Sequence, residues 1–136
     1  MKTLLVRDLM TEDVFSVGPK DRLSAVFDLM VERHVRHVPV VDDDRALLGI
    51  VSHRDLVKNL AEGEVPVGMQ RQLLTRIPVD EIMTRDVETV DPETTIGEAG
   101  QLMIDNKISC LPVVDGDELV GILTESDFVR CVIDRL

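Results

Sequence analysis

Two short segments of the chain each place a hydroxyl residue three positions before an aspartate. The first runs Gly49-Ile50-Val51-Ser52-His53-Arg54-Asp55, and the second runs Gly121-Ile122-Leu123-Thr124-Glu125-Ser126-Asp127. Each lies where an apolar strand pattern passes into a helical one, so the hydroxyl and the carboxylate are predicted at the first turn of a helix. A helix N-terminus attracts phosphate through its free N–H groups and its dipole. A carboxylate can accept hydrogen bonds from the vicinal hydroxyls of a ribose. The pattern therefore suits a nucleoside phosphate.

The same spacing also has the form of a helix-capping motif. In that interpretation the side chains of Ser52 and Thr124 cap the helix, and Asp55 and Asp127 bond back to the backbone. Recurrence in two places does not decide the matter, because a duplicated fold duplicates its caps. The two roles are compatible, since a capping hydroxyl can also serve a ligand.

The two segments belong to a duplication that spans the chain. Val6 to Val57 reads like Val79 to Val129, with Met10 matching Met83 at an offset of 73 residues (83 minus 10) and Gly49 matching Gly121 at an offset of 72 (121 minus 49). We predict two repeats, 1–60 and 79–136, joined by a connecting segment, 61–78. Since a chain of 136 residues has the size of one domain, we expect the repeats to share a core and to be related by a pseudo-two-fold axis.

Each repeat is predicted to run β-α-β-β-α, an α/β fold of the α+β type with the repeats packed through their sheets. Proline fixes φ and ends the first apolar runs, and helical spacing of apolar residues follows. The acidic segments 42–45 and 115–118 are predicted as hairpin turns. A capping box is predicted at Thr95–Glu98, with Asp21 or Ser24 as the corresponding cap in the first repeat. A helical piece from Met69 to Arg76 is expected to pack back. The predicted strands are 14–17, 37–41 and 47–51, and 87–90, 110–114 and 119–123.

Composition excludes several classes of protein. The net charge is −11 and the pI is about 4.6, whereas nucleic-acid binding needs a clustered basic surface. No apolar run approaches the length of a membrane span. Cys110 and Cys131 form no CxxC motif and follow no secretory signal, so we expect reduced thiols in a cytoplasmic protein.

Catalytic and metal-binding alternatives have weak support. Ser52, His53 and Asp55 are neighbours at one helix start, so they do not face one another as a triad does. The chain has no P-loop, no dinucleotide-binding glycine pattern and no HExxH motif, and we expect no enzyme. His34 and His37 need not converge on a metal, and 42–44 lacks the EF-hand pattern.

Several motifs occur in the same order in both repeats. The runs DLMT…P…LM…RHVPVVD…LLGIVS..D and EIMT…P…LM…ISCLPVVD…LVGILT..D closely resemble the cystathionine β-synthase (CBS) domain over about residues 4–134. Two such domains in tandem look like a Bateman module. The resemblance implies paired clefts that bind adenosyl ligands, association into homodimers and regulation of a protein target, here unknown.

The resemblance also implies roles for individual residues. Asp55 and Asp127 match the ribose-binding aspartate, and Ser52 and Thr124 match the hydroxyl on the phosphate side. The walls that sandwich the base correspond to Val14, Val17, Val38, Pro39, Val40, Val87, Val90, Leu111, Pro112 and Val113.

Charged residues near the two motifs differ between the repeats. The first repeat has Arg36-His37 and His53-Arg54 where the second has Ser109-Cys110 and Glu125-Ser126. Arg–phosphate contacts are charge-assisted, so we add Arg36, His37, His53 and Arg54 to the phosphate-binding candidates and predict different preferences of the two clefts for phosphate charge. The alternative is that these are solvated surface charges.

The predicted function is a regulatory module that senses AMP, ADP or ATP, with or without Mg²⁺, and requires no cofactor. S-adenosylmethionine and NAD are alternative ligands. The main rival is a ligand-free module that works through protein contacts, and neither interpretation involves nucleic acid or a membrane.

Overall fold

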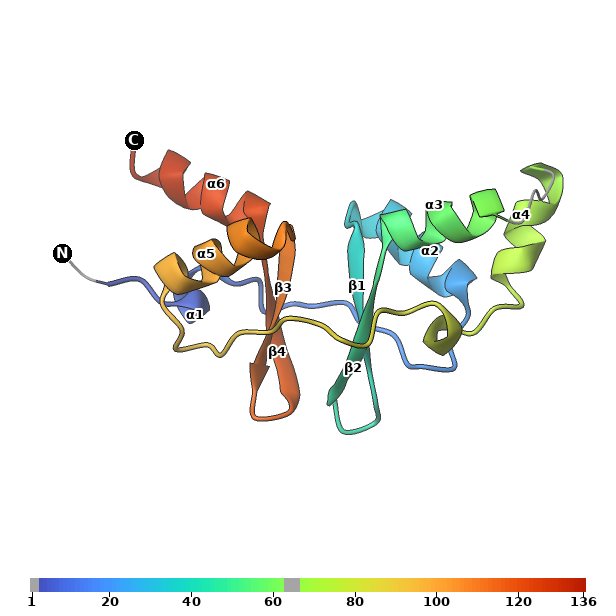
Figure 1. Ribbon diagram of the computed structural model, residues 1–136, viewed down its shortest axis with the longest axis horizontal. Coiled ribbons are helices and arrows are strands. Elements are labelled where there is room, and N and C mark those ends of the chain that lie inside the picture. The colour runs from blue at the N-terminus through green and yellow to red at the C-terminus, as the bar shows by residue number, and fades with distance from the viewer. Residues whose placement is uncertain (1–2, 63–66) are drawn as a thin grey trace. The chain divides into compact units, whose positions relative to one another are not determined.

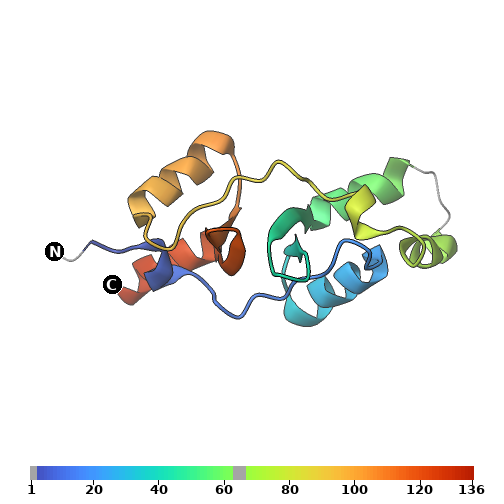
Figure 2. The same cartoon turned by 90° about the horizontal axis from the view of Figure 1, so that it is seen from below.

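The computed structural model describes residues 3–62 and 67–136, and the chain divides into two compact units. Unit 1 comprises Met1–Val14 and Glu88–Leu136, and unit 2 comprises Phe15–Val87. The chain therefore passes twice between the units, as the blue and yellow segments of Figure 2 show. Residues 63–66 of the predicted connecting segment lie outside the described residues.

Each unit contains one two-stranded antiparallel sheet with helices packed on it (Figure 1). This confirms the predicted fold class of mixed helices and strands, with both hairpins where they were expected. The predicted pseudo-two-fold axis and the packing of the sheets stay predictions.

The elements of unit 2 are α2 (Leu23–Arg33), β1 (His37–Val41), β2 (Leu47–Ser52), α3 (His53–Glu62), α4 (Val67–Leu74) and the 3-10 helix η1 (Val79–Glu81). Those of unit 1 are α1 (Val6–Leu9), α5 (Ile96–Asn106), β3 (Cys110–Asp115), β4 (Glu118–Thr124) and α6 (Glu125–Asp134).

The predicted first strand of each repeat is reduced to a single parallel bridge. Val17 N donates to Pro39 O at 3.0 Å, and Val41 N donates to Val17 O at 2.9 Å. The next rung of this ladder would need an N–H at position 39, which proline lacks, so the ladder cannot extend back to Phe15. The second copy repeats the arrangement with Val90, Pro112 and Val114.

The first residues of each repeat pack in the unit that holds the rest of the other repeat. Val6 is fully buried in the core of unit 1, and its counterpart Val79 is fully buried in the core of unit 2. Thr11 exchanges two backbone hydrogen bonds with Ile122 of β4, at 2.9 and 3.0 Å. Residues 79–87 thus complete unit 2, and residues 3–14 complete unit 1. The compact units therefore differ from the linear repeats 1–60 and 79–136.

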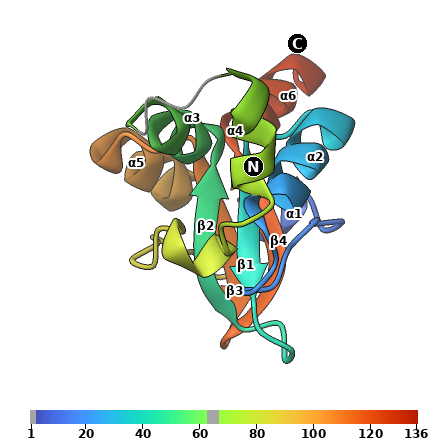
Figure 3. The ribbon, with the colours of Figure 1, turned by 90° about the vertical axis from the view of Figure 1, so that its right-hand side faces the viewer.

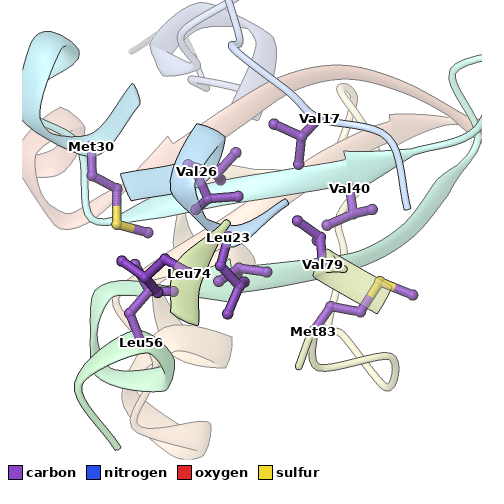
Figure 4. Packing of buried hydrophobic residues seen from close by; sticks show 11 residues of the cluster. Val17, Leu23, Val26, Met30, Val40, Leu56, Leu74, Val79 and Met83 are labelled. Carbon is purple, nitrogen blue, oxygen red and sulfur yellow. The ribbon is translucent and has the colours of Figure 1, made fainter. Parts of the chain in front are cut away.

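Helix α4 covers part of the helical face of unit 2. Leu74 of α4 is buried in the same cluster as Leu56 of α3 and Leu23 of α2 (Figure 4). Arg71 of α4 lies 3.7 Å from Asp28 of α2, and the three helices are seen together in Figure 3. The helical piece predicted from Met69 to Arg76 therefore exists, shifted two residues toward the N-terminus, and it packs back onto unit 2 as expected.

Of the capping box predicted at Thr95–Glu98, the bond to the Thr95 hydroxyl is confirmed, and the cap predicted in the first repeat is wrong. Thr95 Oγ1 accepts a hydrogen bond from Glu98 N at 3.2 Å. In the first repeat the N-cap position is Arg22, with no side-chain bond, because Asp21 instead accepts from Gly18 N at 2.7 Å and closes the preceding turn.

Helices α2 and α5 each end at a residue whose backbone lies in the left-handed region, where glycine is favoured. His34 has φ 55° after α2, and Lys107 has φ 54° after α5; both side chains are exposed. Because a Cβ is strained there and these side chains have little packing to lose, His34→Gly and Lys107→Gly should each raise the free energy of unfolding by about 1 kcal/mol. Urea denaturation would measure this. Lower midpoints in both variants would contradict the expectation.

Candidate functional site

The first candidate site lies at the start of α3, and we call it the first corner (Arg36, His37 and Ser52–Asp55). Ser52 is the last residue of β2 and pairs with His37 of β1. Ser52 N donates to Asp55 Oδ2 at 2.8 Å, and Asp55 N donates to Ser52 Oγ at 3.1 Å. This reciprocal pair is a capping box, so the structural role considered for the motif is present. Ser52 and Asp55 are both half-buried.

The second corner (Ser109, Cys110 and Thr124–Asp127) is the counterpart at the start of α6. Thr124 N donates to Asp127 Oδ2 at 2.9 Å, and Thr124 Oγ1 donates to the same oxygen at 3.3 Å. Asp127 is 6% exposed and is the one buried polar or charged residue of the part of the chain that the structure describes. In both corners the aspartate accepts a hydrogen bond from the backbone N–H of the hydroxyl residue, but the two aspartates differ in how deeply they are buried.

Asp127 also contacts two side chains that the sequence interpretation missed. Thr11 Oγ1 donates a long hydrogen bond of 3.5 Å to Asp127 Oδ1, and Arg130 Nη1 lies 3.8 Å from the same oxygen. Thr11 follows Met10 in the DLMT motif, which recurs as EIMT at Thr84, so the repeated threonine was the available signal. Thr84 exchanges backbone hydrogen bonds with Ile50, next to the first corner in sequence.

Cys110 is a buried thiol in the second corner. Burial raises its pKa from 9.0 to about 12, and the negative charge of Asp127 contributes in the same direction. The thiol is therefore protonated at neutral pH. A protonated thiol is a weak nucleophile, so Cys110 is suited to packing rather than to chemistry.

The first corner carries basic residues at four positions, Arg36, His37, His53 and Arg54. His53 N donates to Arg36 O at 2.8 Å, which joins two segments distant in sequence. The side chains of Arg36, His53 and Arg54 are exposed, and His37 is half-buried. At the second corner Glu125 N donates to Ser109 O at 3.2 Å, so the equivalent positions carry one carboxylate and no cation.

The residues predicted to sandwich a base lie mostly in the two cores. Val14 and Val87 are half-buried, and the remaining eight are buried. Because a core side chain offers little surface to a ligand, contact with these segments would fall largely on their backbone; the assignment stays a prediction. The core members are Val17, Val38 and Val40 in unit 2 and Val90, Leu111 and Val113 in unit 1.

The described residues also bear on metal binding and on membrane insertion. Within residues 3–62 and 67–136, no three His, Cys, Asp or Glu side chains gather as a metal site requires. His34 ends α2, and His37 begins β1. None of the helices in those ranges combines the length and apolar character needed to cross a bilayer.

Comparisons with known proteins agree with this architecture. The family model of the CBS domain matches the chain twice, over residues 6–62 and 79–134. The crystal structure of AcuB from Vibrio cholerae superposes with a TM-score of 0.86 at 37% identity, covering 98% of this chain and 93% of that one. Among curated proteins, the homoserine O-acetyltransferase of Methanohalobium evestigatum is 30% identical over 128 residues, which are 93% of this chain and 24% of the acetyltransferase.

Two similar structures were solved with adenosyl compounds. The CBS domain pair of protein MJ0100, in complex with 5′-methylthioadenosine and S-adenosyl-L-methionine, has a TM-score of 0.84 at 25% identity, covering 99% of this chain and 100% of that one. CBSX2 in complex with AMP has a TM-score of 0.81 at 31% identity, covering 97% and 98%. With both repeats matched and the fold shared, the chain belongs to the CBS domain family as a tandem CBS domain pair.

Proposed function

We propose that this CBS domain pair binds an adenine nucleotide of the AMP, ADP or ATP type and acts as a sensor that regulates a protein partner. The observation that carries the proposal is the corner itself, in which a hydroxyl, a carboxylate and a helix N-terminus meet at the end of a strand. These groups match a phosphate and a ribose diol. Similar pairs bind AMP, or 5′-methylthioadenosine and S-adenosylmethionine, so the adenosyl class has direct precedent.

The rival function is a ligand-free module that works through protein contacts. The bonds from each aspartate to the hydroxyl residue three positions earlier favour it to some degree, because they give both motifs a structural reason to exist without a ligand. The proposed sensor additionally requires two conformations of the protein with different affinities for the ligand. Binding can shift the equilibrium between these conformations only by as much as the two affinities differ.

Thermal unfolding with candidate ligands tests the two functions directly. Protein shown by mass spectrometry to be ligand-free would be heated with AMP, ADP or ATP (each with and without Mg²⁺), NAD or S-adenosylmethionine. At a hundred times the dissociation constant, a true ligand should add about 2.7 kcal/mol of apparent stability. Ribose 5-phosphate serves as the control without adenine. No shift with any adenosyl compound would favour the contact module.

We also propose that the chain forms a homodimer through the exposed helical face of unit 1. The apolar residues Ile104, Val129, Val132 and Ile133 are exposed on α5 and α6, with Ile104 at 72%. In unit 2 the counterparts of Ile104 and Val129, Val31 and Val57, are 58% and 51% exposed, and α4 packs on the same helix pair, whereas the described residues of unit 1 contain no helix equivalent to α4. In a two-fold dimer the same face of each copy meets its partner, so these residues would be buried in both copies.

Matched substitutions at equivalent helix positions test this interface. Val129, 57% exposed, corresponds to Val57 of unit 2, 51% exposed. Val129→Asp should raise the dimer dissociation constant at least tenfold, because a carboxylate would be buried against its own copy, whereas Val57→Asp should leave it unchanged. Sedimentation velocity across a concentration series measures both. Equal weakening by the two variants, or a wild-type monomer, would contradict the proposed face.

A further inference from the structure

We propose that the two corners have different roles. A nucleotide binds at the first corner alone, and Asp127 of the second corner is a structural carboxylate that links α6 to Thr11, in the N-terminal segment 3–14. The inference rests on the proposed function and deepens it, since it states how many ligands bind and which residues hold them.

The first step concerns the hydrogen-bonding capacity of Asp127. Its Oδ2 accepts from both the backbone and the hydroxyl of Thr124, and its Oδ1 faces Thr11 Oγ1 and Arg130. With only 6% of the residue exposed, the carboxylate has protein donors at both oxygens and little surface left. A ribose diol would have to displace Thr11, which belongs to a segment also held by two backbone hydrogen bonds to β4.

Asp55 differs on each of these points. Its Oδ2 accepts from Ser52 N at 2.8 Å, and the residue is half-buried rather than buried. Within residues 3–62 and 67–136, Oδ1 of Asp55 has no hydrogen-bond or ion-pair partner. One carboxylate oxygen therefore holds the cap while the other remains available to a ligand's hydroxyls.

Charge separates the corners in the same direction. The backbone hydrogen bond from His53 N to Arg36 O places Arg36 beside the start of α3, where His53 and Arg54 follow Ser52. The second corner carries Glu125 beside Asp127, with Ser109, Cys110 and Ser126 at the positions of the first corner's basic residues. On a chain of net charge −11, the first corner offers a dianionic phosphate two arginines, whereas the second corner offers Glu125 and one nearby arginine, Arg130, which already lies 3.8 Å from Asp127.

Calorimetric titration of the full chain with AMP tests the division of tasks. We expect one AMP per chain, and Asp55→Asn should weaken binding by about 10- to 100-fold, because a charge-assisted contact to the ribose is lost. Asp127→Asn should lower the melting temperature of the ligand-free protein while keeping one site of affinity within about threefold of wild type. Thr11→Val, which removes only one hydroxyl, should lower the melting temperature less and should also keep one AMP site. It provides the test if Asp127→Asn fails to fold.

A second readout separates the phosphate from the ribose. The double variant Arg36→Ala/Arg54→Ala should weaken AMP at least tenfold more than it weakens adenosine. Two AMP sites of similar affinity, or loss of binding in Thr11→Val or Asp127→Asn with retention in Asp55→Asn, would overturn the inference and leave the proposed function standing. Absence of binding by AMP and by every other adenosyl compound would overturn the proposed function itself.

Discussion

Gly49→Ala is expected to lower the free energy of unfolding by about 2–3 kcal/mol, the upper range for overpacking a core site. An alanine Cβ at this position would lie 2.7 Å from Thr84 O and 2.9 Å from Met83 Sδ. The carbonyl cannot move away cheaply, because Thr84 is fixed by two backbone hydrogen bonds to Ile50, at 2.9 and 3.0 Å. Urea denaturation followed by circular dichroism gives the change.

Two other glycines supply the controls. At Gly121 the nearest atom to an added Cβ is Met10 Sδ at 2.7 Å, with Thr11 O at 3.1 Å, so a flexible side chain can absorb part of the clash and the cost should be smaller. At Gly97, inside α5, an added Cβ meets nothing within 4 Å. Gly97→Ala should therefore stabilise the protein by about 0.5–1 kcal/mol. A Gly49→Ala variant as stable as Gly97→Ala would disprove the close approach of residues 83–84 to β2.

Alkaline pH should destabilise the protein through Cys110. Its pKa is 9.0 when exposed and about 12 in the folded state, so between these values the native state holds a proton that the unfolded state has lost. Stability therefore falls as pH rises, by up to about 1.4 kcal/mol per pH unit from about pH 9 to pH 12. Below pH 9 the thiol is protonated in both states, and its contribution to stability does not change with pH.

The difference between wild type and Cys110→Ala isolates this effect from other groups that titrate at high pH. Near neutral pH the variant should be the less stable of the two, since it loses a buried sulfur. Above pH 9 the wild type should lose stability faster than the variant, and the two unfolding curves should converge and then cross. Denaturation at pH 7, 9, 10 and 11 provides the measurement, and parallel pH dependence of the two proteins would show that Cys110 is not buried as a thiol.

Local sequence patterns predicted the hairpins, helices α2 to α6 and the capping role of Thr95, because hydrophobic periodicity and turn residues act over a few neighbouring positions; they did not predict α1 or η1. They failed at Asp21, where a helix cap and a turn competed for one carboxylate. They also overestimated the first strands, whose length is limited by a proline in the neighbouring strand, about twenty residues away.

The difference between Asp55 and Asp127 needed the tertiary structure. The two motifs share the same spacing, and the sequence revealed only the unequal charges beside them. Burial of Asp127 and its contact with Thr11 depend on a segment 116 residues away in sequence. Their contributions to binding stay predictions that the paired variants address.

The sequence by itself determined the duplication, the fold family and the positions of the hairpins, since each is recorded in local pattern and order, and it supplied the candidate residues for a nucleotide, which stay predictions. Only the tertiary structure decided that residues 3–14 complete the unit of the second repeat and residues 79–87 that of the first. The physical reason is the duplication itself. Val6 and Val79 each need an apolar core, and Thr11 and Thr84 each need a strand edge, but the two repeats share one pattern and offer a similar core and a similar edge. Local preference cannot distinguish between them, and the geometry of the folded chain does.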